Sequence, residues 1–122
     1  MYKRLEIWKE SIDLLKEIYS LAEQLPKTEE FNLKIQLKRA MVSVPLNIAE
    51  GKCRSTAKDF SHFLNIAAAS LDEVDVVITI CEELGFFSSA FKSNIEQLHK
   101  KNKILTKRIN ALRKKLVGTN ND

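Results

Sequence analysis

Histidine and glutamate side chains at helical spacing are the first candidates for chemistry in this sequence. Glu96 and His99 form an ExxH step, which in di-iron helical bundles places a carboxylate and an imidazole on one helix face. Such a centre needs two of these steps and two further glutamates, whereas this sequence contains one step. The other histidine, His62, has no glutamate three residues before it. We therefore expect no metal site and no cofactor.

Other kinds of catalytic arrangement are also missing from the sequence. Some small helical RNases use a closely spaced arginine and histidine, but seven residues separate Arg54 from His62, which is too long for that pattern. No P-loop, GxSxG or GxGxxG motif occurs that could supply a nucleophile or a phosphate cradle. Cys53 and Cys81 stand alone, which predicts two reduced thiols. We expect no catalytic residues and no enzymatic activity.

A stripe of polar side chains in the segment 36–54 is more informative. Its members recur at intervals of 3, 4, 4, 3 and 4 residues, which places them on one face of a helix. Serine and asparagine in its middle are poor helix formers that suit fixed networks between packed elements. We predict a buried or interfacial seam, used as an oligomer interface; the alternative is a solvated face. This polar seam consists of Gln36, Arg39, Ser43, Asn47, Glu50 and Arg54.

Positive charge is concentrated at the C-terminal end of the sequence. Residues 88–122 hold nine basic and two acidic side chains, whereas residues 55–87 hold one basic and six acidic. A basic stripe on a helix can follow the phosphates of RNA or DNA without reading sequence. The alternatives are pairing with the acidic segment, in the same or a neighbouring subunit, and a solvated face. The candidate nucleic-acid-binding residues are Lys100, Lys101, Lys103, Lys107, Arg108, Arg113, Lys114 and Lys115.

The elements that would position these side chains are all helical. The 122 residues are 44% hydrophobic with three glycines and two prolines, which suits one domain of long helices joined by short turns. Pro26 ends the first helix, Thr28 is the expected N-cap of the second, Thr56 begins a capping box, and Gly85 is the expected C-cap of the third. We predict an all-α domain over residues 1–122, with helices at about 4–25, 29–51, 56–84 and 89–117.

Two of these helices have a predicted core face. The fourth carries a heptad repeat in which Asn102 is the one polar member; it either fixes register or partner geometry, or lies on a turn that faces solvent. Its members are Ile95, Leu98, Asn102, Leu105, Ile109, Leu112 and Leu116. The first helix should bury Trp8, Ile12, Leu15, Ile18, Ala22 and Leu25. No apolar run is long enough for a membrane span and no signal peptide is evident, so we expect a cytoplasmic protein without a membrane partner.

The segment from Arg39 to Gly51 reads RAxxSxPxNIAEG, and together with positions such as Trp8 and Arg54 it resembles the 23S rRNA intervening-sequence protein family over roughly residues 5 to 115. This motif is the most specific part of the resemblance. One departure is Ala69, where that family tends to have glycine before the serine of its third helix. The matching positions outside the motif are Trp8, Leu25, Pro26, Gln36, Arg54, Phe60, Phe63, Leu64, Ile66, Ala67, Ser70 and Glu73.

The resemblance implies an antiparallel up-and-down four-helix bundle that assembles into a homopentamer and has no enzymatic activity. It also implies a relation to the accessory variability determinants of diversity-generating retroelements, whose basic surfaces engage nucleic acid and a reverse transcriptase. The first functional hypothesis is therefore an accessory protein that binds the RNA or DNA backbone through its basic fourth helix. The second is a homo-oligomeric protein-interaction scaffold that does not bind nucleic acid.

Overall fold

The protein folds as a bundle of four helices. The structure is a computed structural model that describes the backbone of residues 2–121 and the side chains of residues 6–118. Short 3-10 turns at Lys27–Glu29 (η1) and Ser89–Phe91 (η2) lie in two of the connections. The helices are α1 (Tyr2–Ala22), α2 (Leu33–Lys52), α3 (Ala57–Glu83) and α4 (Lys92–Asn121).

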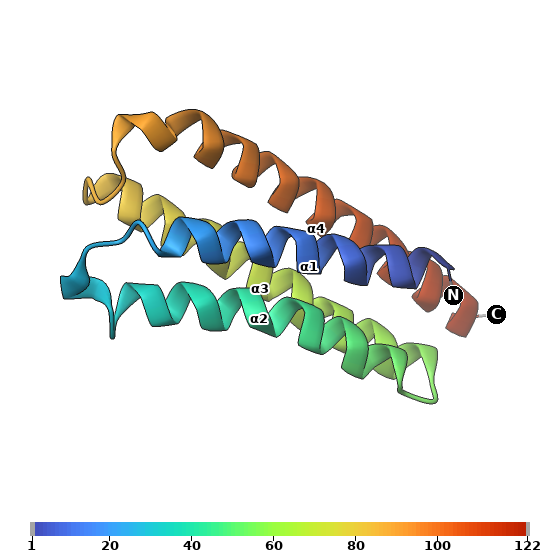
Figure 1. The fold of residues 1–122 in the computed structure, drawn as a ribbon. Coiled ribbons are helices and arrows are strands. Elements are labelled where there is room, and N and C mark those ends of the chain that lie inside the picture. The colour runs from blue at the N-terminus through green and yellow to red at the C-terminus, as the bar shows by residue number, and fades with distance from the viewer. Residues whose placement is uncertain (1, 122) are drawn as a thin grey trace.

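The helices run up and down in chain order. α1 packs against α2 and α4, α2 against α3, and α3 against α4, so each helix contacts its neighbours around the bundle. Figure 1 shows the start of α1 and the end of α4 near the α2–α3 turn, with the other two connections at the opposite end. The described residues contain no strand. The predicted all-α, antiparallel four-helix bundle is confirmed.

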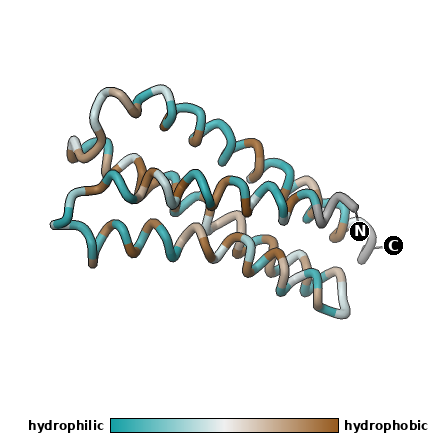
Figure 2. The backbone as a smooth tube through the Cα atoms, viewed as in Figure 1, coloured by the Kyte–Doolittle hydropathy of each residue, from teal (hydrophilic) through white to brown (hydrophobic). Residues whose placement is uncertain are grey.

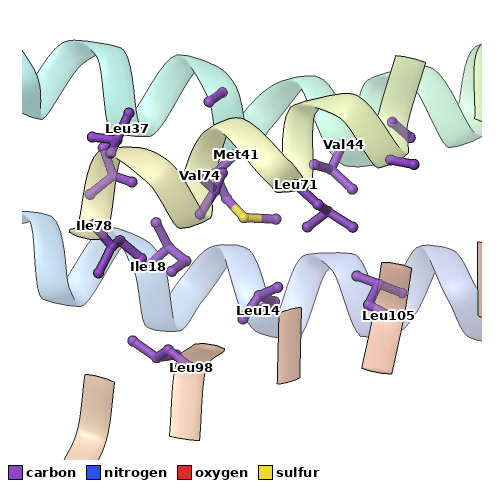
Figure 3. Close-up of a cluster of buried hydrophobic side chains, with 14 of the residues drawn as sticks. Leu14, Ile18, Leu37, Met41, Val44, Leu71, Val74, Ile78, Leu98 and Leu105 are labelled. Carbon is purple, nitrogen blue, oxygen red and sulfur yellow. The ribbon is translucent and has the colours of Figure 1, made fainter. Parts of the chain in front are cut away.

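The core lies along the axis of the bundle and draws apolar side chains from every helix. In Figure 3 the labelled side chains of α1, α2, α3 and α4 point into the space between the ribbons. The α4 repeat is confirmed, because six of its seven members are buried and Leu112 is half-buried. Elsewhere α4 is mainly hydrophilic, as its tube in Figure 2 shows. Asn102 is 4% exposed and donates a hydrogen bond to the carbonyl oxygen of Leu71 at 2.9 Å, so it fixes α4 against α3.

The core face of α1 differs from the prediction. Trp8, Ile12 and Leu15 are half-buried at its edge. The face that points inward includes Ser11, whose hydroxyl donates to the carbonyl oxygen of Trp8 at 2.6 Å and so needs no other partner. Because one position of this buried stripe is a serine, the spacing of apolar residues alone does not reveal the stripe. The buried members are Ile7, Ser11, Leu14, Ile18, Leu21, Ala22 and Leu25.

All helix boundaries lie within four residues of the predicted ones, and the starts of α2 and α4 show why they differ. α2 begins at Leu33 and not near residue 29, and Thr28 lies inside η1, so its assignment as an N-cap is wrong. The reason is that the preceding residues have no core to cover: Phe31 is 89% exposed, and Leu33 is the first residue that packs on the core. Similarly, α4 begins at Lys92 because residues 89–91 form η2.

Two predicted helix ends around α3 are confirmed. The Thr56 hydroxyl accepts a hydrogen bond from the backbone N–H of Asp59 at 3.1 Å, as an N-cap should. At the other end, Gly85 has φ +72° and the N–H of Phe86 binds the carbonyl oxygen of Cys81, which closes the helix.

Gly51 does not end α2 through a left-handed conformation. It lies inside α2, and Gly85 is the glycine with positive φ among the described residues. A Cβ at Gly51 would lie 2.7 Å from Cδ1 of Phe60 and 2.9 Å from Cβ of Phe63. Glycine is therefore required by the close approach of α2 and α3.

Candidate nucleic-acid interface and polar seam

The basic residues of α4 divide between two flanks of the helix. On the flank facing α1, Nζ of Lys101 lies 2.7 Å from a carboxylate oxygen of Glu17, and the guanidinium of Arg108 pairs with Glu10. The members of each pair lie seven residues from those of the other, in opposite chain order, as antiparallel helices require. Lys115 continues this flank. The ion pairs of Lys101 and Arg108 with α1 are exposed, and such pairs add little stability.

The other flank carries four lysines that form no ion pair with any described residue. All four are exposed, and their intervals of 3, 4 and 7 residues place them in one row along α4. At a rise of 1.5 Å per residue the row is about 21 Å long. We call these residues the basic ridge: Lys100, Lys103, Lys107 and Lys114.

Carboxylates of the acidic helix α3 bind a histidine of α4 and not the lysines of the basic ridge. Nδ1 of His99 lies 2.5 Å from a carboxylate oxygen of Asp75, and its Nε2 lies 3.2 Å from one of Glu82. Burial lowers the pKa of His99, but its hydrogen bonds to the two carboxylates outweigh this effect, so the pKa is raised above its usual value. Asp72 and Asp75 also border a groove with Lys100 and Lys103, so the first half of the ridge lies nearer negative charge than the second.

The middle of the polar seam forms a small hydrogen-bonded network between α2 and α3. The hydroxyls of Ser43 and Ser70 lie 2.8 Å apart. The amide of Asn47 donates to the carbonyl oxygen of Ser43 at 2.7 Å and to its hydroxyl at 2.9 Å. Both seam residues are half-buried. Ser70 completes the network from the other helix, and the small residues before it in α3 are the signal that could have predicted a close contact there.

The outer members of the seam are exposed in the single chain. Arg54 pairs with Glu50 at 2.6 Å and lies over the ring of Phe63, with its guanidinium carbon 4.6 Å from the ring centre. Gln36 and Arg39 are also exposed. The interpretation as an oligomer interface thus requires a second surface to cover the seam ends, and it stays a prediction.

Apolar side chains are exposed on the same two helices. Leu46 of α2 is 63% exposed and borders a groove of about 430 Å³ together with Tyr19, Ser43 and Asn47. On α3, Val76 is 57% exposed and Ile80 is 42% exposed. Leu46 thus exposes apolar surface directly beside the polar network, whereas Val76 and Ile80 lie one helical turn apart on α3.

The comparisons with known proteins identify the family. A family model described as 23S rRNA-intervening sequence protein matches residues 3–111. The chain belongs to this family. The comparison with curated proteins found no match.

A solved structure of similar shape supports the fold. It is described as a protein with unknown function from the S23 ribosomal protein family of Bacteroides thetaiotaomicron. The two chains share 19% identity and superpose with a TM-score of 0.81 over 92% of this chain and 98% of the other. The likeness concerns the fold alone.

The residues that carry the 23S rRNA-intervening sequence protein resemblance mostly join α2 to α3. Within the motif from Arg39 to Gly51, Ala40 and Ile48 are buried, Ser43 and Asn47 form the network, and Gly51 permits the close approach. The departure at Ala69 lies on an exposed part of α3. It therefore alters the outer surface of the bundle and not its internal packing.

The sulfur and metal chemistry of the described residues is sparse. No group of three histidine, cysteine, aspartate or glutamate side chains within residues 6–118 could hold a metal ion. Cys53 is an exposed free thiol and Cys81 a buried one, whose pKa is raised to about 11, chiefly by burial. Glu96 is exposed and forms no bond with His99, which is held by α3 instead. Within the part of the chain that is described, no helix has the length and apolar composition to cross a membrane.

Proposed function

We propose that this 23S rRNA-intervening sequence protein is a non-enzymatic, cytoplasmic accessory protein that binds the RNA or DNA backbone through its basic ridge. The observation that carries the proposal is that Lys100, Lys103, Lys107 and Lys114 are exposed in one row and unpaired among the described residues. An arriving phosphate there displaces water and counterions and has no protein carboxylate to replace. Lys101 and Arg108, already paired with α1, would contribute mainly to the surrounding positive field.

Assembly into a homo-oligomer would strengthen such binding. A single ridge provides four phosphate contacts, which gives weak and salt-sensitive affinity. Several copies in one assembly, such as the homopentamer implied by the resemblance, raise the overall affinity by avidity. The relation to retroelement accessory proteins suggests a reverse transcriptase as a further partner.

Titration of RNA and DNA duplexes against charge-reversal variants tests the ridge. In the ridge variant all four ridge lysines become glutamate. In the control variant the same change is made at four exposed lysines elsewhere that form no ion pair with a described residue: Lys9, Lys16, Lys27 and Lys58. Both variants lose the same net charge. Comparing the affinities of the two variants therefore distinguishes an effect of the ridge itself from an effect of overall charge.

We expect the ridge variant to lose at least about tenfold in affinity and the control variant much less. In the wild type, four contacts predict a slope of about −3 to −4 for the logarithm of the binding constant against the logarithm of salt concentration. Equal losses in the two variants, or no wild-type binding at low salt, would refute the proposed function.

The second candidate function is a homo-oligomeric protein-interaction scaffold that does not bind nucleic acid. It is supported by the exposed Leu46, which borders a groove with the seam residues Ser43 and Asn47, and by the exposed Val76 and Ile80 of α3. Changing these three residues to glutamate should reduce an oligomeric mass, measured by light scattering, to that of one chain. Changing Ile104, which is 57% exposed on α4, should leave it unaltered. A wild-type mass of one chain at every salt concentration removes this candidate.

A further inference from the structure

A groove at the C-terminal end of the basic ridge has an unusual set of polar groups. It has a volume of about 510 Å³ and lies between the first turns of α3 and the last part of α4. Its lining residues are Ser61, Asn110, Arg113, Lys114 and Val117. None of them is acidic. The grooves between α1 and α4, by contrast, are lined by Glu6, Glu10 or Glu17.

The guanidinium of Arg113 donates a hydrogen bond to a described residue from only one of its nitrogens. Its Nη1 donates to Oδ1 of Asn110 at 2.9 Å, which leaves the edge formed by Nε and Nη2. The Nε–H is buried and has no acceptor among the described residues. A buried donor without an acceptor is unfavourable, so the position favours an acceptor that the chain itself does not provide. Arginine presents this edge to oxyanions through two parallel hydrogen bonds.

Three further donors lie around the same groove. Ser61 is 8% exposed, and its hydroxyl forms no hydrogen bond with a described residue. Lys114 is exposed, carries a second positive charge and belongs to the ridge. Because the amide oxygen of Asn110 is held by Arg113, its amide nitrogen remains as a donor. Donors therefore predominate, and the groove suits a compact anion with several acceptor oxygens.

We propose that this groove binds one phosphate group, held by the Nε–Nη2 edge of Arg113, the Ser61 hydroxyl and the Lys114 ammonium. Because Nε is covered, the guanidinium turns its edge toward the groove when the ligand enters. One part of this proposal rests on the proposed function: the phosphate belongs to a bound RNA or DNA strand. It is either a terminal phosphate monoester or an internal phosphodiester. The groove would thereby fix the position of the strand at one end of the ridge.

Titrations with inorganic phosphate, followed by amide NMR shifts, test the groove itself. Arg113→Lys keeps the charge but removes the two-donor edge, and Ser61→Ala removes the hydroxyl. We expect each change to weaken phosphate binding by about fivefold or more. Arg108→Lys, on the α1 flank, is the matched control and should bind as the wild type does. If Arg113→Lys fails to fold, as judged by circular dichroism, Ser61→Ala alone decides.

Oligonucleotides that end in a 5′-phosphate or a 5′-hydroxyl distinguish the two sources. A preference for the phosphorylated end that Arg113→Lys abolishes assigns a terminal monoester, whereas equal affinities that Arg113→Lys lowers together assign an internal phosphodiester. Changing only Lys100, Lys103 and Lys107 to glutamate should leave phosphate binding intact; if that variant also keeps full oligonucleotide affinity, the ridge proposal fails and the groove stands. Wild-type phosphate affinity in both Arg113→Lys and Ser61→Ala, or no saturable phosphate binding by the wild type, overturns the groove.

Discussion

Gly51→Ala probes the contact on which the α2–α3 half of the bundle depends. The added Cβ would lie 2.7 Å from Cδ1 of Phe60, 2.9 Å from Cβ of Phe63 and 3.2 Å from the carbonyl oxygen of Phe60, whereas ordinary contacts are 3.4–4 Å. The ring of Phe60 can rotate, but Cβ of Phe63 and the carbonyl oxygen are fixed to the α3 backbone. The two helices must therefore separate by several tenths of an ångström.

The expected change in stability is the sum of two opposing effects. Overpacking of this kind costs about 1–3 kcal/mol, and alanine gains up to about 1 kcal/mol over glycine in a helix. We expect Gly51→Ala to lower the free energy of unfolding by about 1–2 kcal/mol. For a domain of this size that corresponds to a fall of roughly 3–8 °C in Tm. Gly51→Val, with two more methyl groups, should cost about 3 kcal/mol or more.

Urea and thermal denaturation can measure these changes against two glycine controls. Gly118→Ala meets nothing within 4 Å and should be neutral or slightly stabilising. Gly85→Ala also meets open space but sits at φ +72°, so it should cost about 1–2 kcal/mol through backbone strain. Phe60→Leu should recover part of the loss caused by Gly51→Ala. If Gly51→Ala is as stable as Gly118→Ala, the close-approach argument is wrong.

Three further predictions concern single side chains. Cys53 should react with a thiol reagent at neutral pH and Cys81 should not until the chain unfolds, because the pKa of Cys81 is raised to about 11; equal rates in the folded protein would contradict this. His99→Gln should lower the free energy of unfolding, measured by urea denaturation, at pH 5.5 and much less at pH 9. The raised pKa of His99 stabilises the folded state below about pH 6.5, and this contribution is lost as the pH rises through the folded-state pKa. A loss of stability that does not depend on pH would count against the histidine bridge. Asn47→Leu should cost about 1–3 kcal/mol by leaving seam partners unsatisfied, whereas Lys58→Leu on the surface should be near neutral, and equal melting temperatures would show that the network contributes nothing.

The sequence predicted the parts of the fold that depend on local signals. The α4 repeat, the Thr56 cap and the Gly85 turn each follow from residue type at short spacing, and each is confirmed. The core face of α1 could not be found in this way, because Ser11 satisfies its own hydroxyl within the helix and can be buried at low cost. Apolar periodicity cannot detect such a serine. The start of α2 likewise depends on where the tertiary core ends.

The candidate site shows the same division between local and tertiary information. Residue type alone gave eight basic candidates, but only the antiparallel pairing of α1 with α4 assigns Lys101 and Arg108 to ion pairs, while the four ridge lysines have none with a described residue. The equal seven-residue spacings of Glu10 and Glu17 and of Lys101 and Arg108 were visible in the sequence, yet their meaning required the helix order. Charge reversal at Lys101 or Arg108 would place like charges beside Glu17 or Glu10, so it perturbs the α1–α4 contact as well as the surface. The ridge lysines, which hold nothing in the described chain, are therefore the residues at which a loss of nucleic-acid binding can be attributed to binding itself.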